Sequence, residues 1–108
     1  MDLTAIKCVP CQGGVQPIQG KELDKYKQEV PSWELYEGST RIRKEFVFDN
    51  FKGAINFVNK VADQAEREGH HPNIYVFDYK HVRIELWTHK INGLHKNDFI
   101  LAAKIDAL

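Results

Sequence analysis

The chain has 108 residues, the length of one compact domain, with 43 % hydrophobic and 28 % charged residues, so a disordered tail or a fibrous protein is excluded. Fifteen Lys and Arg balance fifteen Asp and Glu, which leaves none of the basic excess that a dedicated nucleic-acid binder carries. No segment approaches the roughly 20 apolar residues of a membrane span, and the first residues lack the layout of a signal peptide. We therefore expect a cytoplasmic protein that binds neither nucleic acid nor membrane.

Residues 1–20 are expected to be an irregular N-terminal arm, and residues 21–108 a single domain. Proline and glycine interrupt the arm repeatedly, and no apolar period survives in it. The arm contains Cys8 and Cys11, which are too few for a disulfide framework. Their Cys-x-x-Cys spacing suits zinc, but no second pair completes four ligands, so a metal site is not expected.

The first half of the domain is predicted to be a helix followed by a hairpin. Residues 21–30 have apolar side chains at helical spacing, and Pro31 stops the helix. Residues 33–37 and 40–48 are then predicted strands, the second with period-2 alternation, and Gly38-Ser39 forms the turn between them.

The longest predicted helix follows this hairpin. Asp49 or Asn50 can cap its N-terminus, Gly69 ends it with a left-handed residue, and Pro72 prevents any continuation. Side chains at three- and four-residue steps form its expected apolar face: Phe51, Ala54, Ile55, Val58, Val61, Ala62 and Ala65.

Two more strands and a helix complete the chain. Strands are predicted at residues 73–78 and 81–89 around a turn at 78–80, and a last helix at 96–108. The order α-β-β-α-β-β-α predicts an α+β fold of two layers, in which helices cover one face of a four-stranded antiparallel sheet.

Candidate catalytic residues cluster around the end of the long helix. The sequence Glu66-x-x-x-His70-His71-Pro72 lies there, His89 is expected to close the fourth strand, and Asp98 lies near the start of the last helix. Histidine, with an ordinary pKa of about 6.5, can give or accept a proton near neutral pH. The alternative is a solvated helix end beside an aspartate that only caps a helix. Adjacent histidines point apart on an extended backbone, which argues against a shared metal ion.

The two tryptophans differ in their expected surroundings. Trp33 is most simply a core residue, although an aromatic ring can stack on a flat heterocycle. Trp87 lies opposite the apolar side of its strand, which indicates either contact with a partner subunit or cover by the arm or neighbouring long side chains.

The ordered set Glu66-x3-His70-His71-Pro72-x6-Tyr79-x9-His89-x8-Asp98 resembles the signature of the pterin-4a-carbinolamine dehydratases. The resemblance covers about residues 20–108 and extends to Trp33, Phe46-x-Phe48-x-x-Phe51, Thr88-His89 and Gly93-Leu94. The arm also looks like that of bacterial members.

This resemblance implies a lyase that removes water from 4a-hydroxytetrahydrobiopterin and gives quinonoid dihydropterin. Such an enzyme recycles the pterin cofactor of aromatic amino-acid hydroxylases and needs neither metal nor organic cofactor. The resemblance also implies a homodimer joined through sheet edges, or a homotetramer.

The resemblance implies a role for each residue that matches the family's signature. His70 and His89 look like the acid–base pair, and His71 would bind and orient the pterin. The remaining implied binding residues are Trp33 as an aromatic wall, Glu66 and Asp98 as hydrogen-bonding supports, and Pro72 as a backbone constraint. Which histidine is the acid and which the base stays open.

One departure concerns His95, which replaces the serine that usually caps the last helix and is expected to weaken that cap. Two other functions stay open: a binding or dimerisation module for a protein partner, and action on another pterin, including one in molybdenum-cofactor metabolism.

Overall fold

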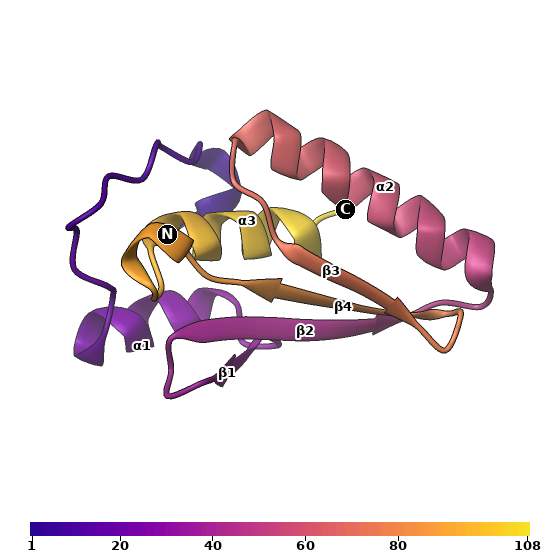
Figure 1. The fold of residues 1–108 in the computed structure, drawn as a ribbon, viewed down its shortest axis with the longest axis horizontal. Helices are drawn as coiled ribbons and strands as arrows, with labels where there is room; N and C mark the ends of the chain where they lie inside the picture. The colour runs from indigo at the N-terminus through magenta and orange to yellow at the C-terminus, as the bar shows by residue number, and fades with distance from the viewer.

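The computed structural model describes residues 1–108 and has three α-helices and four strands (Figure 1). In chain order they are α1 (Gly20–Glu29), β1 (Glu34–Tyr36), β2 (Arg41–Val47), α2 (Phe51–Glu68), β3 (Asn73–Phe77), β4 (His81–Leu86) and α3 (Lys96–Asp106). Two short 3₁₀ helices, η1 (Leu3–Ala5) and η2 (His89–Ile91), lie before α1 and after β4. The predicted order of elements and the α+β class are confirmed.

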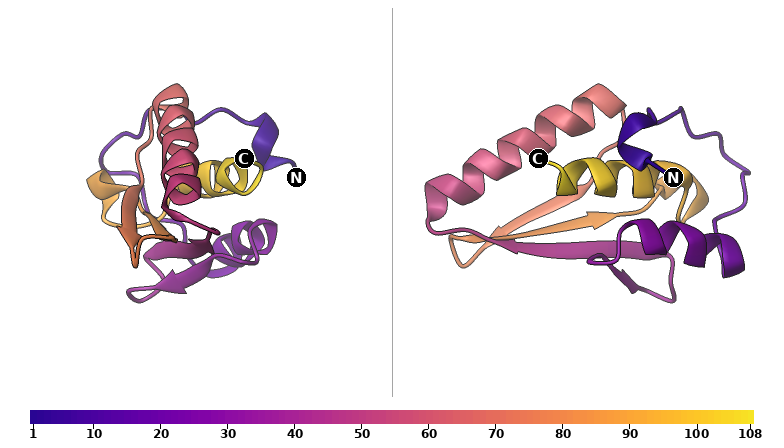
Figure 2. Two further views of the ribbon diagram at one scale, coloured as in Figure 1. Left: turned by 90° about the vertical axis from the view of Figure 1, so that its right-hand side faces the viewer. Right: turned by 180° about the vertical axis from the view of Figure 1, so that it is seen from behind.

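The four strands form one antiparallel sheet in the order β1-β2-β4-β3. Alternation along β4 sets its two faces, because Val82, Ile84 and Leu86 are fully buried while the residues between them are not. Ile42 of β2 lies opposite Leu86 and is also buried. This apolar face packs under the helices, which lie on one side of the sheet (Figure 2).

Helix α2 begins and ends as the sequence predicts. The side chain of Asn50 accepts a hydrogen bond from the Gly53 N–H at 2.7 Å, and Gly69 takes the left-handed conformation with φ of 64°. The predicted apolar face is wrong at Phe51 and Ala62, which are exposed. Phe57 is buried instead and packs against the aromatic rings of β2 and the residue after it, so the buried stripe is rotated.

The fourth strand ends earlier than predicted, at Leu86 rather than His89. Thr88 and Gly93 pair as an isolated bridge, with the Thr88 N–H bonded to the Gly93 carbonyl at 2.8 Å. The residues between them form η2, which closes on Asn92 in a left-handed conformation. His89 therefore begins a tight turn instead of completing a strand, and its side chain is exposed.

The N-terminal arm is irregular apart from η1 and lies against the domain along much of its length. Leu3 and Cys8 are 3 % and 6 % exposed and belong to the same hydrophobic core as the sheet. Ile18 is held by a hydrogen bond from its N–H to the Leu94 carbonyl at 2.8 Å. Helix α1 then packs on α3, where Tyr26 stacks on Phe99. No helix of the structure has both the length and the apolar character needed to cross a bilayer.

Candidate functional site

The loop between α2 and β3 places His70 against the first turn of α3. Gly69 ends α2 in a left-handed conformation, so His70, the next residue, does not continue the helix. His70 Nε2 lies 2.6 Å from Asp98 Oδ1, and the two side chains are 12 % and 0 % exposed. A buried carboxylate requires hydrogen-bond partners, and His70 supplies one of them.

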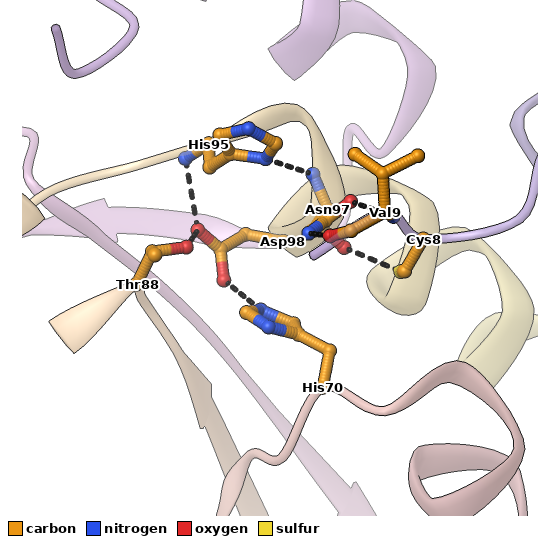
Figure 3. A network of polar contacts seen from close by, with 7 residues as sticks. All are labelled: Cys8, Val9, His70, Thr88, His95, Asn97 and Asp98. Carbon is orange, nitrogen blue, oxygen red and sulfur yellow. Dashed lines mark hydrogen bonds and ion pairs between the residues drawn. The ribbon is translucent and has the colours of Figure 1, made fainter. Parts of the chain in front are cut away.

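Asp98 is the centre of a small buried network (Figure 3). Its Oδ2 accepts hydrogen bonds from the Thr88 hydroxyl and the His95 backbone N–H, both at 2.9 Å. An ionised carboxylate only accepts hydrogen bonds, so beside ionised Asp98 the His70 Nε2 that faces Oδ1 is the nitrogen that carries hydrogen. In neutral His70 the lone pair is then on Nδ1, which makes no hydrogen bond within the chain.

The expectation of a weakened cap at His95 is wrong. The His95 Nδ1 accepts a hydrogen bond from the Asn97 N–H at 3.0 Å, and the His95 N–H donates to Asp98 Oδ2 at 2.9 Å, so His95 and Asp98 form a complete capping box. Burial lowers the pKa of His95 and outweighs the opposite effect of Asp98. An unprotonated Nδ1 is the state that can accept the capping hydrogen bond.

A cavity of about 510 Å³ lies beside this network. Its walls come from four parts of the chain: residues 9–11 of the arm, residues 69–73 after α2, residues 87–90 after β4, and Asn97 of α3. Four of the predicted site residues line it together: His70, His71, Pro72 and His89. Segments far apart in the sequence are thus brought to one place, with Asp98 directly behind His70.

His89 is held by an aromatic stack. Its ring lies on the indole of Trp87, with 4.5 Å between centroids, and the Arg41 guanidinium covers Trp87 at 4.4 Å. The long side chain that covers Trp87 is therefore Arg41 of β2. The sequence analysis does not place Trp87 in the site, although its position two residues before His89 is a signal that could have done so.

Glu66 and His71 form a pair at the rim. His71 Nε2 lies 2.6 Å from Glu66 Oε2, but the two side chains are 63 % and 76 % exposed. Solvent screens such a pair strongly, so its contribution to stability is small. His71 lines the cavity, whereas Glu66 reaches it only through this contact.

Trp33 lies elsewhere. It is 1 % exposed, and its Nε1–H donates to Asp106 Oδ2 at 3.1 Å. Asp106 is at the opposite end of α3 from Asp98, about 12 Å along the helix axis at 1.5 Å per residue. Trp33 is thus a core residue, and Trp87 is the tryptophan that lines the cavity.

The polar groups around the cavity do not form a cluster of three or more His, Cys, Asp or Glu side chains that could hold a metal ion. Cys8 and Cys11 are free thiols. Cys8 Sγ lies 3.6 Å from the Asn97 carbonyl, and burial raises its pKa to about 12. It is thus an unreactive thiol packed against α3.

Comparisons with known proteins identify the family of the chain. The sequence model of the family described as Pterin 4 alpha carbinolamine dehydratase matches residues 16–108. A Methylococcus capsulatus protein named "Putative pterin-4-alpha-carbinolamine dehydratase" is 49 % identical over 106 residues, which cover 98 % of this chain and 92 % of the relative.

Two solved structures are also similar. A transcriptional coactivator/pterin dehydratase from Brucella melitensis has a TM-score of 0.77 and 28 % identity, over 85 % of this chain and 97 % of that chain. A pterin dehydratase-like protein, described as a RuBisCO assembly factor in the alpha-carboxysome, has a TM-score of 0.60 and 27 % identity, over 70 % of this chain and 87 % of that chain.

Proposed function

The chain belongs to the pterin-4-alpha-carbinolamine dehydratase family of hydro-lyases, and we propose that it dehydrates a 4a-hydroxytetrahydropterin such as 4a-hydroxytetrahydrobiopterin. The products are quinonoid dihydropterin and water, and the reaction recycles the cofactor of aromatic amino-acid hydroxylases. The observation that carries this proposal is that His70, bonded to the buried carboxylate of Asp98, lines the same cavity as His89.

The reaction needs two proton transfers, and the two histidines can supply them. Cleavage of the C4a–O bond requires a proton on the departing hydroxyl group, which leaves as water. The electron deficit at C4a is relieved when N5 loses its proton to a base and the C4a–N5 double bond forms. One histidine gives a proton and the other takes one, so the pair returns to its starting charge after exchange with solvent. Either histidine can give the proton, and the other then takes one.

The other site residues are proposed to bind and orient the substrate. His71 would hydrogen-bond the pterin, and Glu66 would orient the His71 ring through their 2.6 Å contact. Pro72 would fix the backbone beside them. The cavity volume of about 510 Å³ lies within the range of about 300–1,000 Å³ that is usual for small-molecule sites, and Trp87 is one of the residues that line it.

We also propose that the chain forms a homodimer or homotetramer in the cytoplasm. Strand β3 is at one edge of the sheet, and Tyr75, Val76 and Phe77 on it are exposed. An edge strand with exposed apolar residues can pair with a second copy. Sedimentation analysis of the purified protein tests this: a single monomeric species at micromolar concentration would contradict it.

A role without catalysis is the competing function, since one of the two similar structures is described as a transcriptional coactivator/pterin dehydratase and the other as an assembly factor. The presence of His70, His71 and His89 around one cavity favours catalysis for this chain. Action on a different pterin, including one in molybdenum-cofactor metabolism, would use the same site.

Ultraviolet absorbance of enzymatically generated 4a-hydroxytetrahydropterin tests the proposal. We expect the wild type to accelerate dehydration and His70→Ala and His89→Ala to lose most of this effect. His81→Ala is the matched control, because His81 is on β4 and does not line the cavity. A folded wild-type protein that gives no acceleration would refute the activity, and full activity in either cavity variant would refute the acid–base pair.

A further inference from the structure

The Asn97 side chain of α3 binds the backbone of the N-terminal arm. Asn97 is 2 % exposed, and its carboxamide makes both possible hydrogen bonds to the backbone of Val9. The Val9 N–H donates to Asn97 Oδ1 at 3.0 Å, and Asn97 Nδ2 donates to the Val9 carbonyl at 2.6 Å (Figure 3). A buried amide satisfied in this way fixes the position and direction of the arm at this residue.

Two more contacts hold the residues on either side of Val9. The Cys8 N–H donates to Glu68 Oε1 at 2.9 Å, and Glu68 is itself paired with Lys104 at 2.8 Å. Lys90 Nζ donates to the Cys11 carbonyl at 3.3 Å. The segment is therefore attached to the end of α2, to α3 and to η2, and of these elements α3 and η2 also contribute residues to the cavity.

The attached segment presents mainly apolar side chains to the cavity. Val9, Pro10 and Cys11 line it, and Val9 is 58 % exposed. The N–H and carbonyl of Val9 and the carbonyl of Cys11 already have partners. The apolar side chains of the segment offer a bound molecule surface for van der Waals contact, which suits the face or edge of a flat heterocycle.

We propose that Val9, Pro10 and Cys11 form one wall of the pterin-binding site, and that Asn97 is the positioning residue that holds this wall in place. This inference rests on the proposed function, because it takes the pterin as the occupant of the cavity. Asn97 does not touch the reacting atoms in this account. It acts through the arm, so it sets substrate affinity rather than the rate of proton transfer.

Steady-state kinetics separate these two effects. We expect Asn97→Ala to raise KM by about tenfold, the factor that corresponds to about 1.4 kcal/mol of binding free energy, with kcat and its pH profile unchanged. Asn59→Ala is the matched control, because Asn59 is an exposed residue of α2 outside the cavity. A fall in kcat with KM unchanged would overturn the inference, because it would place Asn97 in the support of Asp98.

A second measurement uses the wild-type protein and needs no variant to fold. Cys11 lines the cavity, whereas Cys8 is buried with a pKa of about 12, so a thiol reagent modifies Cys11 selectively. The probe is 7,8-dihydrobiopterin, which lacks the 4a-hydroxyl group and cannot be dehydrated. We expect saturating probe to slow the alkylation of Cys11, which is measured by mass spectrometry. In the control variant Cys11→Ser/Val15→Cys, the probe should not slow alkylation of the new thiol. Val15 is exposed on the arm and does not line the cavity.

The outcomes separate the inference from the proposed function. Probe binding, measured by calorimetry, together with protection of Cys11 supports the wall. Probe binding without protection overturns the wall and leaves the dehydratase proposal standing. Absence of both probe binding and turnover overturns both.

Discussion

Asp98→Asn is the most informative single substitution, because it changes one atom in the network behind His70. The Asp98 side chain is fully buried, so the variant must satisfy the same three neighbours. Its amide oxygen has to stay at the Oδ2 position, where the Thr88 hydroxyl and the His95 N–H both donate. The amide NH₂ then faces His70 Nε2, which must accept instead of donate.

This change reverses the tautomer of His70 without breaking the fold. Nδ1, the nitrogen with the lone pair in the wild type, becomes the protonated one, and no negative charge remains to stabilise an imidazolium. Replacing a charge-assisted hydrogen bond by a neutral one costs about 1–2 kcal/mol of folding free energy. The effect on kcat/KM is larger, a fall of about 10²- to 10⁴-fold, since a correctly placed general acid or base contributes about this factor.

The assay is dehydration followed by absorbance, beside urea unfolding of the same samples. Asp106→Asn is the control: it makes the same chemical change on the same helix, where Asp106 bonds Trp33 and Lys44 instead of a site residue. We expect it to lower stability and leave kcat/KM unchanged. An Asp98→Asn protein with kcat/KM within a few-fold of wild type would refute the assignment of the His70 tautomer.

Three further changes test other parts of the structure. Burial lowers the pKa of His95 below its ordinary value of 6.5, so the unfolded state binds more protons and stability falls as pH drops from that value towards the folded pKa. His95→Ser keeps a cap, and its free energy of unfolding, measured in urea, should fall less steeply with decreasing pH. Equal slopes of unfolding free energy against pH in the variant and the wild type would contradict this. Although burial by itself raises the pKa of Glu68, the bonds from Lys104 and the Cys8 N–H outweigh it and lower that pKa. Glu68→Gln removes the charge that pairs with Lys104 and should cost about 2 kcal/mol of folding free energy at pH 7, against almost nothing for Asp63→Asn, since Asp63 is exposed; equal losses in thermal unfolding would exclude this explanation. Trp87→Leu removes the stack on His89 and should lower kcat/KM by about tenfold, a prediction that unchanged kinetics would reject.

The fold could be predicted from the sequence because its periodicity is strong where packing depends on it. Alternation in β4 and the capped apolar repeat of α2 each follow from local chemistry. The predicted end of the fourth strand is wrong, because Thr88 continues the alternation while its bonds to Gly93 depend on the four-residue turn 89–92. The predicted buried face of α2 omits Phe57, because apolar periodicity alone defines the rotation of the helix about its own axis only to within about one residue.

The candidate site could be predicted only in part. The order of the histidines along the chain and the family resemblance predict a shared site, and the structure brings His70, His71 and His89 to one cavity. Trp33 is a core residue, as its sequence position indicates, and the aromatic wall that the resemblance implies for it is wrong. Trp87, expected to meet a partner subunit or to be covered, lines the cavity, because a tryptophan beside a strand has the same sequence pattern whether it faces the core or a cavity. The contribution of Val9 was not predicted, since its contact with Asn97 spans 88 positions and the arm has no periodic pattern to reveal it.

The dependence of the cavity on distant segments has a consequence for folding. Asp98 joins positions 70, 88 and 95, and Asn97 joins position 9, so the site exists only after the arm, α2, β4 and α3 have all docked. Contacts of such long range form late, because the entropy of closing large loops is lost before they stabilise the chain. Recovery of activity during refolding should therefore lag behind the recovery of helical circular dichroism, and no fragment that lacks one of these segments should retain the site.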